Sequence, residues 1–186
     1  GVVPARGQLD AKERIGLFKT MAEGAFASVA IVESASEVPA EAARWLRDNN
    51  LPATLRMGED ARLADMPWGA TALDMAKGPS DGRDLNAVSH AFAGVAESGT
   101  LIMASGPENP STLNFLPDNH IVVLSGADLQ GDYESVFDRL REKYGKGVMP
   151  RTVNMITGPS RSADIAQTML LGAHGPRKLH IVVVDA

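Results

Sequence analysis

Short, nearly continuous runs of valine, isoleucine and leucine alternate along this chain with segments that carry apolar residues at helical spacing. A strand that is apolar on both faces has to be covered on both faces, which is typical of parallel sheets enclosed by helices. The pattern therefore predicts an α/β fold with three layers, in which a Rossmann-like sheet is sandwiched by helices. The expected strands are Ser28–Val32, Ala53–Met57, Trp68–Leu73, Thr100–Ala104, Ile121–Leu124, Thr152–Ile156 and Leu179–Val184.

The segments between these strands predict helices. Proline suits the first turn of a helix, and Pro39 opens one of them. Asp132 and Gly145 stand where the N-cap and the C-cap of another are expected. Gly58–Asp84 is richer in Gly, Asp and Pro and predicts a long loop over the sheet edge. The expected helices are Leu9–Ala25, Pro39–Asn49, Ala87–Ala96, Asp132–Tyr144 and Ser162–Leu171.

Size and charge limit what the chain can be. Its 186 residues suit one domain over residues 1–186. The formal net charge of -5 argues against nucleic acid and membrane surfaces as partners, and no apolar run approaches the length that spans a bilayer. We see no signal peptide, so a cytoplasmic location is expected. The chain begins at Gly1 without a methionine, so we expect a natural N-terminal segment to be missing.

Cysteine is absent, which excludes disulfides, thiolate-held iron–sulfur clusters and zinc sites of the cysteine type. The four histidines form no i, i+4 pair and have no carboxylate cluster beside them, so no metal site is expected. The chain has no G-x-x-x-x-G-K-[ST] phosphate loop and no strand-linked G-x-G-x-x-G. We therefore expect this chain to carry no cofactor of its own.

The first candidate site is the polar run TGPSRS at residues 157–162, directly after an expected strand. Ser162 is placed to cap the next helix, whose free N–H groups, together with Ser160 and Arg161, would attract an anion. Asp164 supports another interpretation, because it lies in the first helical turn and could pair with Arg161. Spacing slightly favours this capped helix with a local ion pair.

Two further polar clusters lie beside expected strands. Glu97 follows a small-residue helix next to Gly99, and its carboxylate could act as a nucleophile or general base. An exposed glutamate before a turn is the more common situation. Asn114 and His120 lie in a polar segment that leads into Ile121–Leu124. There His120 could serve as an acid, a base or a ligand, or the segment could be a structured turn.

Three long blocks in this order resemble the signature of the lactate-utilization protein C family, the LutC/YkgG family with a LUD domain. Pro67-Trp68 fits the same signature. Ser98 and Ser162 stand where the family usually has threonine, and both keep the hydroxyl. The blocks are residues 89–100 (SHAFAGVAESGT), 113–123 (LNFLPDNHIVV) and 152–184, which contains ITGPSRSADI and LGAHGPRKLH.

The resemblance implies a fold similar to the NagB/RpiA/CoA-transferase group and a role in oxidising L-lactate to pyruvate. In that role the chain is a non-redox subunit acting with iron–sulfur partner proteins. An alternative implied by the same group is a CoA-transferase-like or cyclo-ligase-like enzyme, with Glu97 as nucleophile and Arg161 beside Ser162 holding a carboxylate or phosphate. A carboxylate- or nucleotide-binding module without turnover is a third interpretation. A small carboxylate or acyl-CoA ligand and a homo-oligomer are compatible with these alternatives.

Overall fold

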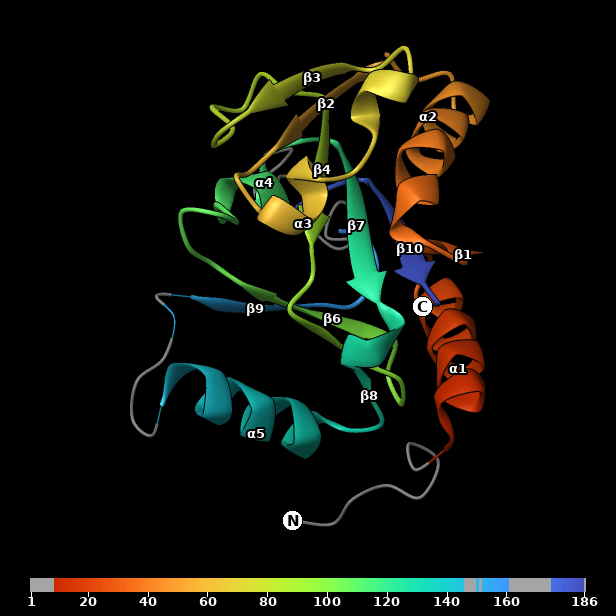
Figure 1. Cartoon of the computed structure of the whole chain (residues 1–186), viewed down its shortest axis with the longest axis vertical. Coiled ribbons are helices and arrows are strands. Elements are labelled where there is room, and N and C mark those ends of the chain that lie inside the picture. Colours follow the sequence, from red (N-terminus) through yellow and green to blue (C-terminus); the bar gives the residue numbers. More distant parts are fainter. Residues whose placement is uncertain (1–8, 146–149, 151, 161–174, 186) are drawn as a thin grey trace, which may run out of the picture.

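A six-stranded parallel sheet forms the centre of the protein (Figure 1). The computed structural model describes residues 9–145, 150, 152–160 and 175–185. The strands of this sheet are β1 (Ser28–Val32), β2 (Thr54–Met57), β3 (Asp74–Lys77), β4 (Asn86–His90), β7 (Asn119–Ser125) and β10 (Lys178–Val184). Their order is β1-β10-β7-β4-β2-β3, and every neighbouring pair is parallel. All six carboxyl ends therefore lie along one edge of the sheet.

A second, four-stranded sheet lies beyond the carboxyl ends of β4 and β7 (Figure 1). Its strands are β5 (Ala93–Val95), β6 (Thr100–Ala104), β8 (Leu129–Gln130) and β9 (Val153–Ile156), in the order β8-β5-β6-β9. Strand β6 is antiparallel to β5 and β9, whereas β5 and β8 are parallel. Because β4 leads into β5 and β7 leads into β8 within a few residues, the loops at this edge are held between the two sheets.

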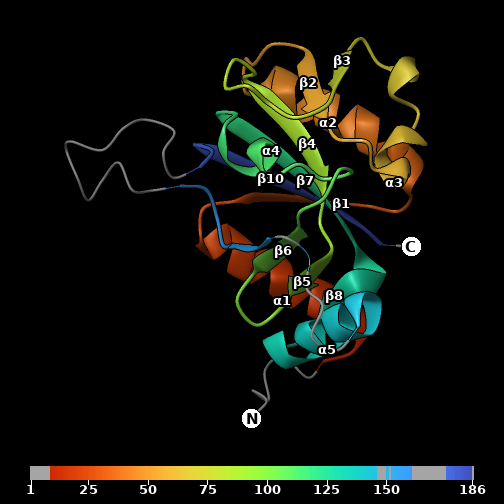
Figure 2. The same cartoon turned by 90° about the vertical axis from the view of Figure 1, so that its left-hand side faces the viewer.

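Helices cover both faces of the large sheet (Figure 2). On one face, α1 (Ala11–Gly24) and the second sheet share a core with it, which contains Phe18, Leu101 and Ile181. On the other face, α2 (Val38–Asp48) and α3 (Ala61–Ala64) pack over a core that contains Trp45 and Leu63. Helix α4 (Thr112–Phe115) lies against β4, and α5 (Tyr133–Tyr144) covers the second sheet. The predicted α/β architecture with helices on both sides of a sheet is confirmed.

The burial of β7 explains why apolar and polar residues do not alternate in its sequence. Ile121 and Val123 point into the core under α2, whereas Val122 and Leu124 point into the core under α1. None of these four side chains is exposed. A strand buried on both faces needs apolar residues at every position, which is what the sequence indicated.

The helix ends follow from local polar residues. Asp10 accepts a hydrogen bond from the Glu13 N–H at 2.8 Å and the Glu13 carboxylate returns to the Asp10 N–H, so α1 starts with a capping box. Asp132 accepts from the Ser135 N–H at 2.8 Å, and α5 ends at Gly145 with φ 86°. The helices predicted over residues 9–25, 39–49 and 132–144 are therefore confirmed to within two residues at each end.

The helix predicted over Ala87–Ala96 is wrong, because this segment forms β4 and β5. Its small residues are typical of a helix that packs closely on a sheet, but here they allow two strands to pack closely instead. A Cβ placed on Gly94 would lie 2.8 Å from a Leu124 methyl carbon. The two sheets meet here with no room for a larger side chain, and this requirement overrides the helix propensity of alanine.

The strand predicted over Trp68–Leu73 is also wrong. A short 3-10 helix, Trp68–Ala70, turns the Trp68 indole inward, where Nε1 donates a hydrogen bond to the Leu63 carbonyl at 2.7 Å. The strand of this region is β3, which begins directly after Leu73. The segment Gly58–Asp84 therefore contains a helix, a 3-10 helix and a strand and is not one long loop as predicted. The helix predicted over Ser162–Leu171 lies outside the described residues. Among the residues that the structure describes, no helix has the length and apolar character needed to cross a bilayer.

Candidate functional site

A pocket of about 390 Å³ lies at the carboxyl edge of the large sheet, between the end of β4, the loop after β6 and the end of α5. Ligands bind at this edge in open α/β sheets, and the volume falls in the range of small-molecule sites. We call it the carboxyl-edge pocket. Six side chains that can bind or position a ligand line it: Arg62, His90, Phe92, Ser105, Asn109 and Lys143. The carboxylate of Glu108 lines the pocket as well.

His90 is the last residue of β4 and is only 3% exposed. Its Nδ1 atom lies 2.8 Å from the Ala91 carbonyl oxygen, which can only accept, so Nδ1 carries the proton. Burial, together with the charge of Arg62, lowers the pKa of His90 and keeps the ring neutral. The Nε2 atom is left as an acceptor, with only a long contact of 3.5 Å to the Ser125 hydroxyl.

Arg62 is held at the pocket by Asp60, which is 2% exposed. The Asp60 carboxylate accepts from Arg62 Nη2 at 2.8 Å and from the Asn109 amide at 3.0 Å, and it also caps α3. Burial would raise the pKa of Asp60, but the hydrogen bonds from Arg62 and Asn109 outweigh it and lower the pKa to about 2. Asp60 therefore stays ionised and connects α3 to the loop after β6.

Two cations flank the ring of Phe92. The guanidinium carbon of Arg139 lies 5.9 Å and the Lys143 Nζ atom 5.1 Å from the ring centroid. Arg139 is paired with Asp128 at 2.6 Å. Lys143 has no carboxylate partner within the part of the chain that the structure describes. Lys143 is an exposed residue, so its ammonium group is a solvent-accessible positive charge that lines the pocket together with Arg62.

Two polar atoms of lining residues are also unused. The Ser105 hydroxyl oxygen and the Asn109 Oδ1 atom are buried and have no hydrogen-bond partner among the described residues. Buried polar atoms are normally paired, so these two atoms beside the pocket are candidates for hydrogen bonds to a bound ligand. The pocket thus combines cationic side chains, the Glu108 carboxylate, hydrogen-bond acceptors and a hydroxyl. A small ligand that offers a carboxylate to the cations and a hydroxyl to the acceptors suits this lining.

Comparison with known proteins identifies the family of this chain. Residues 86–184 match the family described as the LUD domain. This chain belongs to the LUD domain family. The matched LUD segment contains the second sheet, β4, β7 and β10, and among the six lining side chains named above only Arg62 lies outside it.

Two relatives match about half of this chain. A protein of Neisseria meningitidis serogroup B is 38% identical over 96 residues, which are 52% of this chain and 40% of that protein. A protein named lactate utilization protein C from Geobacillus thermodenitrificans is 39% identical over 93 residues, which are 49% of this chain and 39% of that protein. The match thus spans about two fifths of the length of these relatives. The resemblance to the lactate-utilization protein C family is confirmed.

A solved structure shares the fold of this LUD chain. The crystal structure of a DUF162 family protein from Deinococcus radiodurans, at 1.70 Å resolution, covers 95% of this chain and 99% of its own with a TM-score of 0.68. The two sequences are 21% identical. At that identity the likeness establishes the fold.

Glu97 lies in the turn between β5 and β6 and does not line the carboxyl-edge pocket. It is 8% exposed, its backbone N–H donates to the Gly131 carbonyl at 3.3 Å, and its Oε2 atom has no hydrogen-bond partner among the described residues. The interpretation as an exposed glutamate before a turn is wrong, because the side chain is buried. A catalytic role for Glu97 stays a prediction.

His120 and Asn114 lie toward the other end of the large sheet. Strand β7 begins at Asn119, so His120 is inside the sheet rather than before it, and it is 0% exposed. Burial lowers the pKa of His120 to about 3. Asn114 is a 3% exposed residue of α4. The structure does not bring these two residues to the carboxyl-edge pocket or to Glu97, and their ligand-binding roles stay predictions.

The run after β9 is described only as far as Ser160. The backbone N–H of Ser160 donates to the Pro176 carbonyl at 2.8 Å. The Thr157 hydroxyl lies 2.7 Å from the Thr100 hydroxyl, which places the start of this run beside the β5–β6 turn. Arg161, Ser162 and the helix that they were predicted to open lie outside the described residues. The predicted anion site therefore stays a prediction.

Sequence reasoning missed four residues of the carboxyl-edge pocket: Arg62, His90, Phe92 and Lys143. For His90 a signal existed, since a polar residue at the carboxyl end of a strand is a candidate ligand-binding residue. The helix predicted over Ala87–Ala96 concealed that strand end. Arg62 and Lys143 come from helices distant in sequence, and nothing in the sequence indicates that they converge.

Proposed function

We propose that this LUD-domain chain takes part in L-lactate utilization and that the carboxyl-edge pocket binds a small carboxylate of the lactate or pyruvate type. The process is the one in the name of its lactate utilization protein C relatives. The observation that carries the ligand class is the ammonium of Lys143, which has no carboxylate partner among the described residues, beside the neutral ring of His90.

The donors and acceptors around the pocket match a 2-hydroxycarboxylate. Lys143 attracts the carboxylate, and the Ser105 hydroxyl can donate to it once its side chain turns inward. His90 Nε2 is an acceptor whose contact with the Ser125 hydroxyl is long, at 3.5 Å, so a ligand hydroxyl can donate to it instead. L-lactate offers both groups, whereas pyruvate offers the carboxylate and an acceptor only. The proposal therefore expects L-lactate to bind more tightly than pyruvate.

A calorimetric titration of the purified chain with L-lactate, pyruvate and D-lactate tests the proposal. The Lys143→Ala variant removes the unpaired cation and should weaken L-lactate binding at least about tenfold, since a charge-assisted hydrogen bond contributes roughly 1.5–3 kcal/mol. Lys12→Ala removes the same charge from an exposed position of α1 and should leave the affinity unchanged. Absence of binding, or equal affinities in the two variants, would refute the ligand assignment.

We further propose that the chain is a cytoplasmic, non-redox subunit that acts with iron–sulfur partner proteins. The printed sequence has no cysteine, so a thiolate-held cluster would have to come from outside it. Affinity purification of the tagged chain from lactate-grown cells should recover proteins with the absorbance and iron content of such clusters. Normal growth on lactate after deletion of the chain would contradict the proposed pathway.

A further inference from the structure

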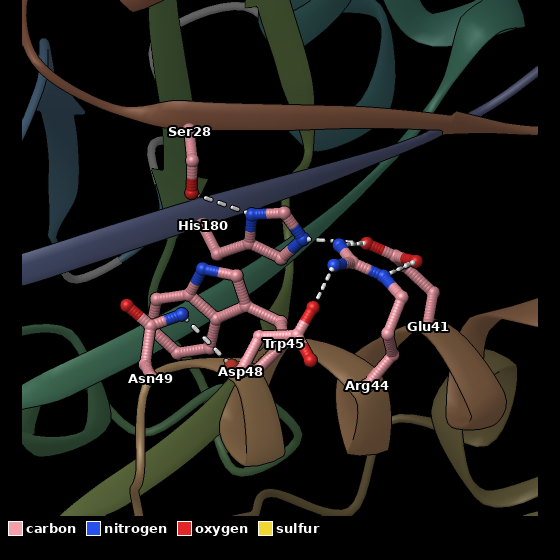
Figure 3. A network of polar contacts seen from close by, with 7 residues as sticks. All are labelled: Ser28, Glu41, Arg44, Trp45, Asp48, Asn49 and His180. Atoms are coloured by element: carbon pink, nitrogen blue, oxygen red, sulfur yellow. Dashed lines mark hydrogen bonds and ion pairs between the residues drawn. The ribbon is translucent and has the colours of Figure 1, made fainter.

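A serine, a histidine and a glutamate form a hydrogen-bonded line between β1, β10 and α2, beside the edge strand β1 of the large sheet (Figure 3). The Ser28 hydroxyl lies 2.6 Å from His180 Nδ1, and His180 Nε2 lies 3.1 Å from Glu41 Oε1. Ser28 begins β1 and is the register partner of His180 in β10, while Glu41 comes from α2. Three separate elements therefore converge on this line.

The chemistry of the three groups fixes where the protons lie. Burial lowers the pKa of His180, so the ring is neutral and carries one N–H. Burial alone would raise the pKa of Glu41, but hydrogen bonds from Arg44 and His180 lower it overall, so the carboxylate can only accept. The proton of His180 therefore lies on Nε2 and is donated to Glu41. Nδ1 is therefore unprotonated, and it accepts a hydrogen bond from the Ser28 hydroxyl.

The surroundings hold the histidine in this orientation. The indole of Trp45 stacks on its ring, with centroids 5.0 Å apart and planes 5° from parallel. Arg44 donates to Glu41 through Nε at 2.8 Å and bridges it to Asp48 at 2.7 Å (Figure 3). A hydroxyl next to a base that is oriented by a carboxylate is the arrangement that activates nucleophilic serines.

The reactive end of this line is the accessible one. His180 is 2% exposed, whereas Ser28 is only partly buried and starts β1, the outermost strand of the sheet. The line also lies near the amino ends of β1 and β10, at the opposite edge of the sheet from the carboxyl-edge pocket. Neither Ser28 nor His180 is therefore accounted for by the proposed carboxylate site.

We propose that Ser28 is a nucleophile that accepts acyl groups from activated esters or thioesters, with His180 as general base and Glu41 as the positioning carboxylate. The Ser28 oxygen attacks the carbonyl carbon and its proton passes to His180 Nδ1. The bond to the leaving alcohol or thiol then breaks, and that group takes the proton from Nδ1. Water attacks the acyl-serine by the same route, which releases the acid and restores Ser28.

Labelling of the full chain with a fluorophosphonate, followed by intact-protein mass spectrometry, tests this proposal. A single adduct is expected, and peptide analysis should place it on Ser28. It should be absent from Ser28→Ala and should form at least tenfold more slowly in Glu41→Gln, whose side chain keeps the shape but loses the charge. Ser34→Ala removes another partly buried hydroxyl, which contacts Ser36 rather than a histidine, and should label as the unaltered chain does.

A second measurement uses an activated acyl ester directly. With p-nitrophenyl acetate the chain should release a burst of nitrophenolate equal to one acetyl group per chain, and Ser28→Ala should release none above background. Unfolding curves for each variant show whether the fold is retained. The proposal is overturned if no adduct forms on the folded chain, if the adduct persists in Ser28→Ala, or if folded Glu41→Gln reacts at the unaltered rate.

Discussion

The Nε2 atom of His120 lies 2.8 Å from the hydroxyl of Ser89, across the boundary between β7 and β4. Both residues are buried in inner strands of the large sheet, and the Nδ1 atom of His120 has no hydrogen-bond partner among the described residues. A second buried polar pair joins the same two strands, since the Asn119 amide donates to Asn86 Oδ1 at 2.9 Å. The His120–Ser89 contact joins two central strands, and burial lowers the pKa of His120.

We predict that acid destabilises the protein partly through His120. Its pKa is about 3 in the folded protein and 6.5 ordinarily, so between these values the unfolded chain binds a proton that the folded chain does not. Stability is present above pH 6.5 and falls by up to about 1.4 kcal/mol for each pH unit as the pH decreases toward 3. Urea unfolding between about pH 7 and pH 5 measures this slope.

Two variants separate the charge from the hydrogen bond. His120→Gln should reduce the slope, because one fewer buried group takes up a proton on unfolding. Ser89→Ala should lower the free energy of unfolding by about 1–2 kcal/mol at every pH and leave the slope unchanged. An unchanged slope in His120→Gln would show that His90 and His180, whose pKa values burial also lowers, cause the acid sensitivity instead.

Two glycines should respond oppositely to alanine. Gly99 has φ 67°, and a Cβ there would lie 2.3 Å from the backbone nitrogen of Ala22, so Gly99→Ala should cost at least about 2 kcal/mol of stability. Gly16 lies in α1 with nothing within 4 Å of the added carbon, so Gly16→Ala should stabilise by about 0.5–1 kcal/mol. Guanidinium unfolding curves check both, and a neutral Gly99→Ala would show that the turn and α1 can separate without cost.

Much of the large sheet could be predicted because its strands are apolar on both faces. Ser28–Val32 is found over the predicted residues, and β10 differs from its prediction by one. Strands β4 and β5 were missed because the small residues of Ala87–Ala96 carry little strand signal. Small residues are required there only because the two sheets meet at Gly94. The burial of His120, predicted either as an acid, base or ligand or as part of a structured turn, was also missed. It depends on Leu179 and Ser89 in the neighbouring strands, which a local pattern does not reveal.

The carboxyl edge itself was predictable as a binding region, but its chemistry was not. The general rule for α/β sheets indicates where a pocket forms. Its cationic side chains belong to Arg62 and Lys143, which are separated by about half the chain and which α3 and α5 bring to one pocket. Glu97 shows the converse, since a suggestive carboxylate beside a glycine lies instead in a turn packed on α1.

We predict that Asp60→Asn lowers the free energy of unfolding and also lowers the pKa of His90. Asparagine still caps α3, so the loss reports the ion pair with Arg62 and should be about 1–2 kcal/mol at neutral pH. Because the pKa of Asp60 is lowered to about 2, the difference from the unaltered protein should narrow as the pH falls from 3.8 toward 2. The charge of Asp60 raises the pKa of His90, so an NMR titration should show that pKa fall further in the variant.

The control for this prediction is an exposed pair. Asp138 contacts Arg141 at 2.7 Å on the surface of α5, with both side chains more than half exposed. Asp138→Asn should change stability by less than about 0.5 kcal/mol and leave His90 unaffected. Equal losses in the two variants would mean that burial of Asp60 adds nothing to its ion pair.

The last prediction concerns Glu97, whose buried Oε2 atom has no hydrogen-bond partner among the described residues. Removing a buried, incompletely paired charge while keeping the side-chain shape should stabilise the fold, so Glu97→Gln should raise the free energy of unfolding by about 1 kcal/mol. Glu23→Gln, which alters an exposed carboxylate 3.9 Å from Lys19, should change it little. Residues kept for chemistry often cost stability, so a stabilised Glu97→Gln that has also lost lactate-dependent function would favour a catalytic role. A destabilised Glu97→Gln would instead reveal a structural partner of this carboxylate.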